Sequence, residues 1–264
     1  MKLIWFSLLV SAAFASCNLY KPGKVYTPLL ESQHDGNVSV SFGRTFGAQA
    51  SYSPLKNIGV LLNYTNSLPV YEYQTIDNEP DEVLINTYRN QQLEFGLGYY
   101  EKLTDQYYFE IYAGYGKGES GVVEDLYLIR SYEEDNVSFE AIHEYWFIQP
   151  TFSVKFKKSF SFSLSAKLSN TTFYNFNSSQ FFEPPPNFFV NSTILSIQPC
   201  MSLDFGNDWL RGTIQTGLFL ADQSRFYTAR VLNGSIGFGV NLNQLKKTIK
   251  EKKEYKKSSG DYFR

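Results

Sequence analysis

The sequence has few of the residues on which catalytic and metal-binding sites are usually built. Among its 264 residues there are two cysteines, Cys17 and Cys200, and two histidines, His34 and His143. So few thiols exclude a disulfide-rich scaffold, and no Cys/His spacing suits a structural metal. A glycine-rich phosphate loop and a nucleophile elbow are also missing. We therefore expect no catalytic residue, no metal site and no cofactor.

Long apolar runs are equally scarce. The only one is Leu3–Val10, which is too short for a membrane-spanning helix of about 20 residues. Charged residues make up 19% of the chain, below the rough quarter that is usual in soluble domains, while aromatic residues reach 17%. Any crossing of a membrane by this chain would therefore use β-strands.

The N-terminus has the features of an export signal. Lys2 precedes the apolar run, and small residues follow it up to Ser16. The ending Phe14-Ala15-Ser16-Cys17 resembles a bacterial lipobox, although Phe14 stands where leucine is usual. We predict a signal peptide over residues 1–16 and a lipidated N-terminal segment over 17–36, with the lipid on Cys17. The alternative is an ordinary signal peptide followed by a chance cysteine. In that case an exported protein would be expected to pair Cys17 with Cys200.

Residues alternate between apolar and polar through most of the chain. In FIQPTFSVKF (147–156), Ile148, Phe152 and Phe156 share one parity, and Gln149 belongs to the other. A strand places alternate side chains on opposite faces. The same pattern predicts ten strands, at about 37–42, 46–53, 58–64, 93–99, 107–116, 147–156, 160–169, 195–205, 210–220 and 232–242.

The connections between these strands favour a membrane barrel. Short turns follow every second strand, and long polar loops are expected at about 66–91, 117–142, 170–189 and 221–231. Outer-membrane barrels have short periplasmic turns, long external loops and an even number of strands. We predict an all-β, single antiparallel up-and-down transmembrane β-barrel over residues 37–243. A basic periplasmic tail would follow over 244–264, and the lipid anchor would lie on the periplasmic side.

The polar parity decides which face is inside. It carries charges of both signs, and each basic residue would cost roughly 2–4 kcal/mol if it faced lipid near the midplane. In a lumen the charges can pair. A soluble β-sandwich is the alternative, because its antiparallel strands alternate in the same way. The predicted lumen charges are Glu94, Glu110, Lys155, Lys167, Asp204 and Arg211.

Two strands also repeat one another. Ile148-Gln149-Pro150 through Phe156 matches Ile197-Gln198-Pro199 through Phe205, with the parity preserved.

The chain as a whole resembles small lipidated outer-membrane β-barrel proteins of Bacteroidota. The resemblance covers most of residues 17–242 and implies fold and location but no chemistry. It is carried by Leu19–Pro22, Tyr26–Glu31, Ala50–Pro54, Ile58–Val60, Glu94–Tyr100, Phe109–Gly116 and the Ile148-Gln149-Pro150 strand.

Three functions are compatible with such a barrel. Small barrels are filled by their own side chains, so ten strands argue against a wide pore. We expect a non-enzymatic accessory subunit or binding surface of an envelope complex. A narrow channel is the alternative. A surface hydrolase is the third possibility, because omptin-type proteases have ten strands and use a histidine with carboxylates near the external rim. Here that histidine would be His143, with Glu144 adjacent.

Two predicted loops bear on binding. One predicted loop is rich in aromatic residues and prolines: Phe181, Phe182, Pro184, Pro185, Pro186, Phe188 and Phe189. Exposed aromatic residues often mark partner contacts, so this loop is a candidate partner contact. The alternatives are that its aromatic rings pack over the barrel mouth or lie at the lipid interface. The loop at 117–144 is rich in acids and is expected to be solvated, with binding of a divalent cation as the alternative. Its acids are Glu119, Glu124, Asp125, Glu133, Glu134, Asp135, Glu140 and Glu144.

The last 21 residues differ in charge from the rest. Residues 244–264 carry eight bases and three acids, whereas residues 17–243 carry 15 bases and 23 acids. We expect a flexible, solvated tail, and the Lys/Glu spacing allows a short helix as the alternative. Outer-membrane lipid and an envelope protein are the expected partners. Nucleic acid is not expected for an exported protein.

Overall fold

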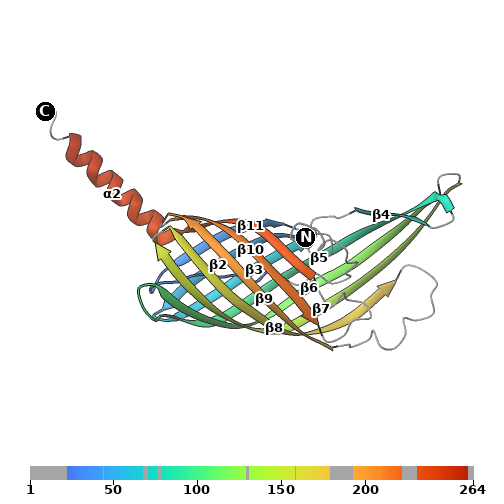
Figure 1. Cartoon of the computed structure of the whole chain (residues 1–264), viewed down its shortest axis with the longest axis horizontal. Coiled ribbons are helices and arrows are strands. Elements are labelled where there is room, and N and C mark those ends of the chain that lie inside the picture. Colours follow the sequence, from blue (N-terminus) through green and yellow to red (C-terminus); the bar gives the residue numbers. More distant parts are fainter. Residues whose placement is uncertain are drawn as a thin grey trace, which may run out of the picture.

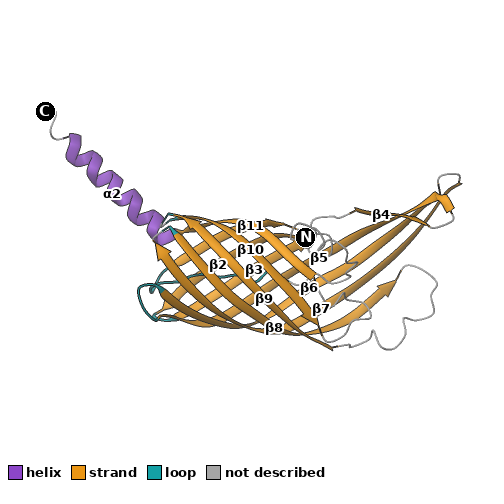
Figure 2. Cartoon of the chain, in the orientation of Figure 1, coloured by secondary structure: helices purple, strands orange, loops and turns teal. Residues whose placement is uncertain are grey.

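The computed structural model shows a closed barrel with one helix projecting from its end (Figures 1 and 2). It describes residues 23–43, 45–67, 71–76, 79–128, 131–157, 159–178, 193–207, 209–221 and 231–260. The strands in chain order are β1 (Gly36–Gly43), β2 (Thr45–Leu55), β3 (Ile58–Ser67), β4 (Tyr71–Ile76), β5 (Glu79–Lys102), β6 (Tyr107–Leu128), β7 (Ser131–Lys157), β8 (Phe160–Ser178), β9 (Thr193–Gly206), β10 (Leu210–Ala221) and β11 (Val231–Asn241).

Ten of these eleven strands close the barrel. All neighbours are antiparallel, and the order β3-β2-β1-β11-β10-β9-β8-β7-β6-β5 returns to its start because β5 also pairs with β3. The eleventh strand, β4, pairs only with the outer part of β5, from Glu79 to Thr87. The predicted ten-stranded antiparallel barrel is thus confirmed.

The barrel has two different ends. Where β2 meets β3, β5 meets β6, β7 meets β8 and β9 meets β10, the connections are short. We call this the turn end. The opposite end, which we call the long-strand end, carries the outer parts of β4 to β8 (Figure 1). There, β5, β6, β7 and β8 are 24, 22, 27 and 19 residues long, whereas the other barrel strands have 8 to 14 residues.

The apolar parity faces outward, as predicted. In the 147–156 strand Ile148, Phe152 and Phe156 are exposed, whereas Gln149 and Thr151 are buried in the lumen. On β5 the outward residues Leu93, Phe95, Leu97 and Tyr99 are likewise exposed. Each of the ten barrel strands carries exposed apolar residues, and together they make an apolar band, the surface that lipid would cover.

Two of the expected loops are mostly strand, so this part of the sequence prediction is wrong. The segment 66–91 contains β4 and the outer half of β5, and the segment 117–142 is a tall hairpin of β6 and β7. β8 likewise continues to Ser178. Beyond the apolar band the outward residues of β6 are polar, beginning with the exposed Lys117 and Glu119, although Ser120 on its lumen side is still buried. The alternation of apolar and polar residues therefore ends there although the backbone pairing continues.

The C-terminal segment forms helix α2 (Leu242–Gly260) instead of the flexible tail that we expected. Lysine and glutamate are good helix formers, and Lys247 and Lys250 lie four residues before Glu251 and Glu254. Asn241 begins the helix, since its side-chain oxygen accepts a hydrogen bond from the Gln244 N–H at 3.0 Å. Among the described residues, no helix has the length and apolar character needed to span a membrane.

Glycines on the lumen face of β5 and β6 make room for aromatic rings. A Cβ on Gly116 would lie 2.2 Å from the Tyr145 ring, and one on Gly98 would lie 2.4 Å from the Tyr112 ring. Tyr112 and Tyr145 pack with Leu61 and Phe147 inside the barrel. The lumen is therefore a packed interior at this level.

The two copies of the repeated Ile-Gln-Pro motif interrupt the sheet in the same way. The pairing of β7 with β8 passes from Ile148 directly to Thr151, and that of β9 with β10 passes from Ile197 to Cys200. Proline has no N–H to donate to a neighbouring strand. Each motif therefore leaves a short gap in the ladder next to its proline.

Candidate functional site

The candidate site is the lumen, because the chain fills it with its own N-terminal segment. Residues 23–35, which we call the lumen segment, precede β1 and lie inside the barrel, where most of them are buried. The segment is irregular: Leu29 and His34 have φ angles of 51° and 63°, in the left-handed region. Its buried backbone polar groups therefore need partners other than a neighbouring strand.

Lumen side chains supply these partners. Gln215 donates to the Val25 carbonyl and Gln149 to the Tyr26 carbonyl, both at 2.6 Å. Asn37 donates to the Pro28 carbonyl. In the other direction, the Leu30 N–H donates to Glu110 Oε1 at 3.0 Å. Four strands therefore hold the backbone of one irregular peptide.

Charged groups fix the segment near the turn end. Glu31 forms ion pairs with Lys155 and with Arg211, the latter at 3.3 Å, and all three side chains are largely buried. Next along the chain, Asn241 donates to Asp35 Oδ1 at 2.8 Å. The His34 N–H donates to the Ser53 carbonyl at 2.7 Å. The lumen segment is thus tied to β2, β7, β10 and β11.

Asn241 joins the lumen segment, the last strand and helix α2, which leads to a prediction. Asn241→Ala should lower the free energy of unfolding by about 2–4 kcal/mol, since it removes a helix cap and a hydrogen bond to a buried carboxylate. Urea unfolding in lipid vesicles would measure this loss. Asn243→Ala is the matched control, because the partly exposed Asn243 donates to the His34 carbonyl and contacts neither the helix cap nor Asp35 among the described residues. Equal losses for the two variants would contradict the role of Asn241.

A second charged cluster lies near the long-strand end of the lumen. Glu94 pairs with Lys167 and accepts hydrogen bonds from Tyr145 at 2.6 Å and from Asn63 at 2.9 Å. The Lys167 ammonium also lies 4.7 Å from the centroid of the Phe147 ring. Every group in this cluster is buried, so the cluster closes the lumen around a paired charge.

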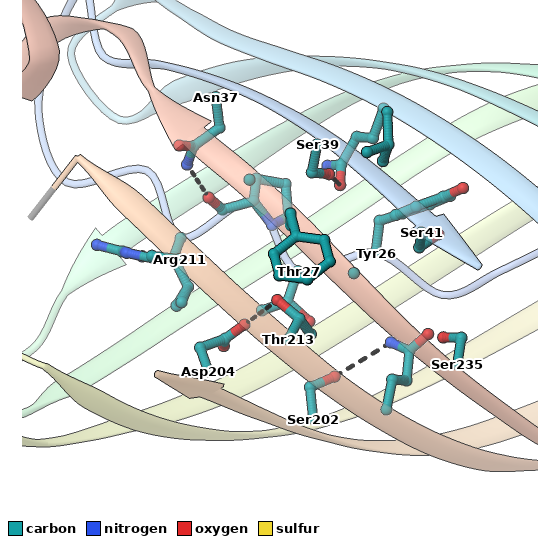
Figure 3. Close-up of a pocket in the computed structure, with 18 of the residues that line it drawn as sticks. Tyr26, Thr27, Asn37, Ser39, Ser41, Ser202, Asp204, Arg211, Thr213 and Ser235 are labelled. Carbon is teal, nitrogen blue, oxygen red and sulfur yellow. Dashed lines mark hydrogen bonds between the residues drawn. The ribbon is translucent and has the colours of Figure 1, made fainter. Parts of the chain in front are cut away.

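A small cavity of about 70 Å³ remains beside the lumen segment (Figure 3). Tyr26, Thr27 and Asn37 line it from one side, and Asp204 and Thr213 from the other, with Thr213 donating to Asp204 at 2.6 Å. This volume holds a few water molecules and no larger solute.

All six predicted lumen charges lie in the lumen, but they do not form one network. Glu94 pairs with Lys167, while Lys155 and Arg211 both pair with Glu31. Glu110 accepts from the lumen segment, and Asp204 accepts from Thr213 and Ser161. Sequence reasoning missed Glu31 and the lumen segment itself. The apolar residues Val25, Tyr26, Leu29 and Leu30, placed just before the first strand, were the available signal.

His143 is buried at the level of Tyr145 and contacts other lumen residues. Ser120 Oγ lies 3.2 Å from its Nδ1, and its ring packs on Tyr145 and Phe173. Glu144 projects to the opposite face, where it binds Tyr174 and Lys117. The structure therefore places His143 and Glu144 on opposite faces of β7, with different partners.

The remaining predicted sites are placed only in part. Cys17 and the segment from Phe181 to Phe189 lie outside the described residues. Of the predicted acidic loop, Glu119 accepts from Gln91 at 3.1 Å, and Glu140 is exposed. Within the described residues no cluster of three or more His, Cys, Asp or Glu side chains could hold a metal ion. Cys200 is a buried free thiol.

Comparison with known proteins adds the following. No protein-family model and no curated protein matches the chain. Solved structures resemble it in fold only. The outer membrane protease OmpT from Escherichia coli has 8% identity and a TM-score of 0.46, over 80% of this chain and 94% of OmpT.

Two further structures are more distant. CarO of Acinetobacter baumannii has 8% identity and a TM-score of 0.33, over 82% of this chain and all of CarO. The NanC porin has 10% identity and a TM-score of 0.31, over 78% of this chain and 98% of NanC. At these values none of the three assigns an activity or a residue to this chain.

Proposed function

We propose that this protein is a non-enzymatic outer-membrane barrel, anchored by a lipid on Cys17, that serves as a subunit or binding surface of an envelope complex. In this proposal the turn end faces the periplasm and the long-strand end faces outward, as in other outer-membrane barrels. The filled lumen and the buried surroundings of His143 favour this role over a channel or a hydrolase.

The projection of the long strands is the observation that carries the proposal. On β6 the last outward aromatic residue of the apolar band is Tyr115, and outward residues beyond it begin with Lys117. The β6–β7 hairpin continues to Leu128, so roughly 40 Å of paired strand extends beyond that point. Transport through the lumen does not need such a structure. A projecting sheet offers a partner both a face and strand edges.

Shortening this hairpin tests the proposal. Val123 and Ser138 are paired across β6 and β7, so residues 124–137 can be replaced by an Asn-Gly turn. We expect a tagged full chain, extracted gently and purified without denaturation, to bring one stoichiometric partner. The shortened variant should lose that partner while still shifting on gels after heating, as an intact barrel does.

A variant that ends at Asn243 is the control, because it removes α2 from the opposite end. It should keep the partner. If the full chain is recovered without any partner, the accessory role is contradicted. Retention of the partner by the shortened variant would move the binding surface away from the hairpin.

A further inference from the structure

The lumen segment runs through the barrel from one end towards the other. Asp35 and His34 are held at the turn end by Asn241 and Ser53. Leu30 bonds Glu110, and Tyr26 bonds Gln149, farther up the lumen. The chain therefore moves away from the turn end as it is followed back towards its N-terminus.

Gly23, the first described residue, lies at the far edge of the membrane band. A Cβ on Gly23 would lie 2.7 Å from Glu94 Oε1 and 3.1 Å from Gln92 Nε2. On the outer face of the same strand, the exposed apolar residues Tyr99, Leu97, Phe95 and Leu93 are followed by the exposed polar residues Gln91 and Arg89. Gly23 is therefore level with the boundary between the lipid-facing and the water-facing parts of β5.

From this position the chain cannot return to the turn end. Cys17 lies outside the described residues, six residues before Gly23, and six residues span at most roughly 20 Å. The apolar band of an outer-membrane barrel is about 25 Å tall. The direct route back through the lumen is occupied by the lumen segment and by Glu31, Lys155 and Arg211.

We infer that the mature N-terminus leaves the barrel at the long-strand end, so that a lipid on Cys17 enters the external leaflet. The sequence alone had favoured the periplasmic side. This inference rests on the barrel orientation in the proposed function. According to this inference, the mature N-terminus and helix α2 lie on opposite sides of the membrane.

Two matched insertions test the inference. One short epitope is inserted after Tyr20 and the other after Gly260, each in the full chain, and intact cells are stained with an antibody that does not cross the outer membrane. We expect the Tyr20 epitope to stain intact cells and the Gly260 epitope to stain only after permeabilisation. Heat-dependent gel mobility shows that each barrel has folded.

The possible outcomes separate this inference from the proposed function. If both epitopes require permeabilisation, the inference is wrong and the orientation of the barrel stands. Staining of the Gly260 epitope on intact cells would overturn the orientation and the inference with it. The mass of the mature protein, compared with that of a Cys17→Ser variant, reports the lipid independently. An unlipidated Cys17 with an externally stained Tyr20 epitope would support the course of the chain and remove the lipid anchor.

Discussion

Replacement of Lys167 by methionine is expected to lower the free energy of unfolding by about 3–5 kcal/mol, because it leaves the Glu94 carboxylate buried without a counter-charge. The side chains of Glu94 and Lys167 are 1% and 4% exposed, so water cannot replace the lost partner. Tyr145 and Asn63 would still donate to Glu94, but neutral donors do not neutralise a charge. Urea unfolding of the barrel in lipid vesicles measures the loss.

A double variant separates the charge from the packing. Glu94→Gln alone should be nearly as harmful as Lys167→Met, since it leaves a buried ammonium group. The two changes together should cost much less than their sum, because no unpaired charge remains. The exposed ion pair of Lys102 and Asp105 provides the control. Its removal by Lys102→Met should change stability little. Additive losses at Glu94 and Lys167 would mean that the two residues act independently.

The sequence predicted the barrel well wherever lipid and lumen impose opposite demands. In the 147–156 strand, lipid requires Ile148 and Phe156 on one face while the lumen admits Gln149 and Lys155 on the other, so apolar and polar residues alternate from Ile148 onward. The strand count and the inward face followed from this pattern. Beyond Tyr115 and Trp146 the outward residues are polar, beginning with Lys117 and Glu144, so the alternation is lost and the outer halves of β6 and β7 were mistaken for a loop.

The contents of the lumen could be predicted only in part, because parity gives the face of a residue and not its partner. Glu94 and Lys167 are 73 positions apart, and only the closure and tilt of the barrel bring them together. The lumen segment has no period at all, since its backbone is held by side chains such as Gln149 and Gln215 and not by a neighbouring strand. Glu31 was therefore missed, although it joins two of the predicted charges.

Removal of the lumen segment is expected to convert a silent barrel into a conducting one. Deletion of residues 23–33 takes away the peptide that occupies the space between the lumen faces of β1, β7 and β10. It also takes away Glu31, which leaves Lys155 and Arg211 facing the vacated space. Water should enter along the path of the peptide, and discrete ion currents should appear in planar lipid bilayers, where the full chain should show none.

A deletion of equal length elsewhere provides the control. Removal of residues 250–260 shortens α2 by eleven residues without touching the lumen, and this variant should stay silent. Currents from the full chain would contradict a lumen closed by its own segment and would favour the narrow channel. A different conclusion follows if the 23–33 deletion variant shows no ion currents but still has the heat-dependent gel mobility of a folded barrel. The Glu94–Lys167 cluster and the rings of Tyr112, Tyr145 and Phe147 would then close the lumen by themselves, and the segment would serve to route the chain.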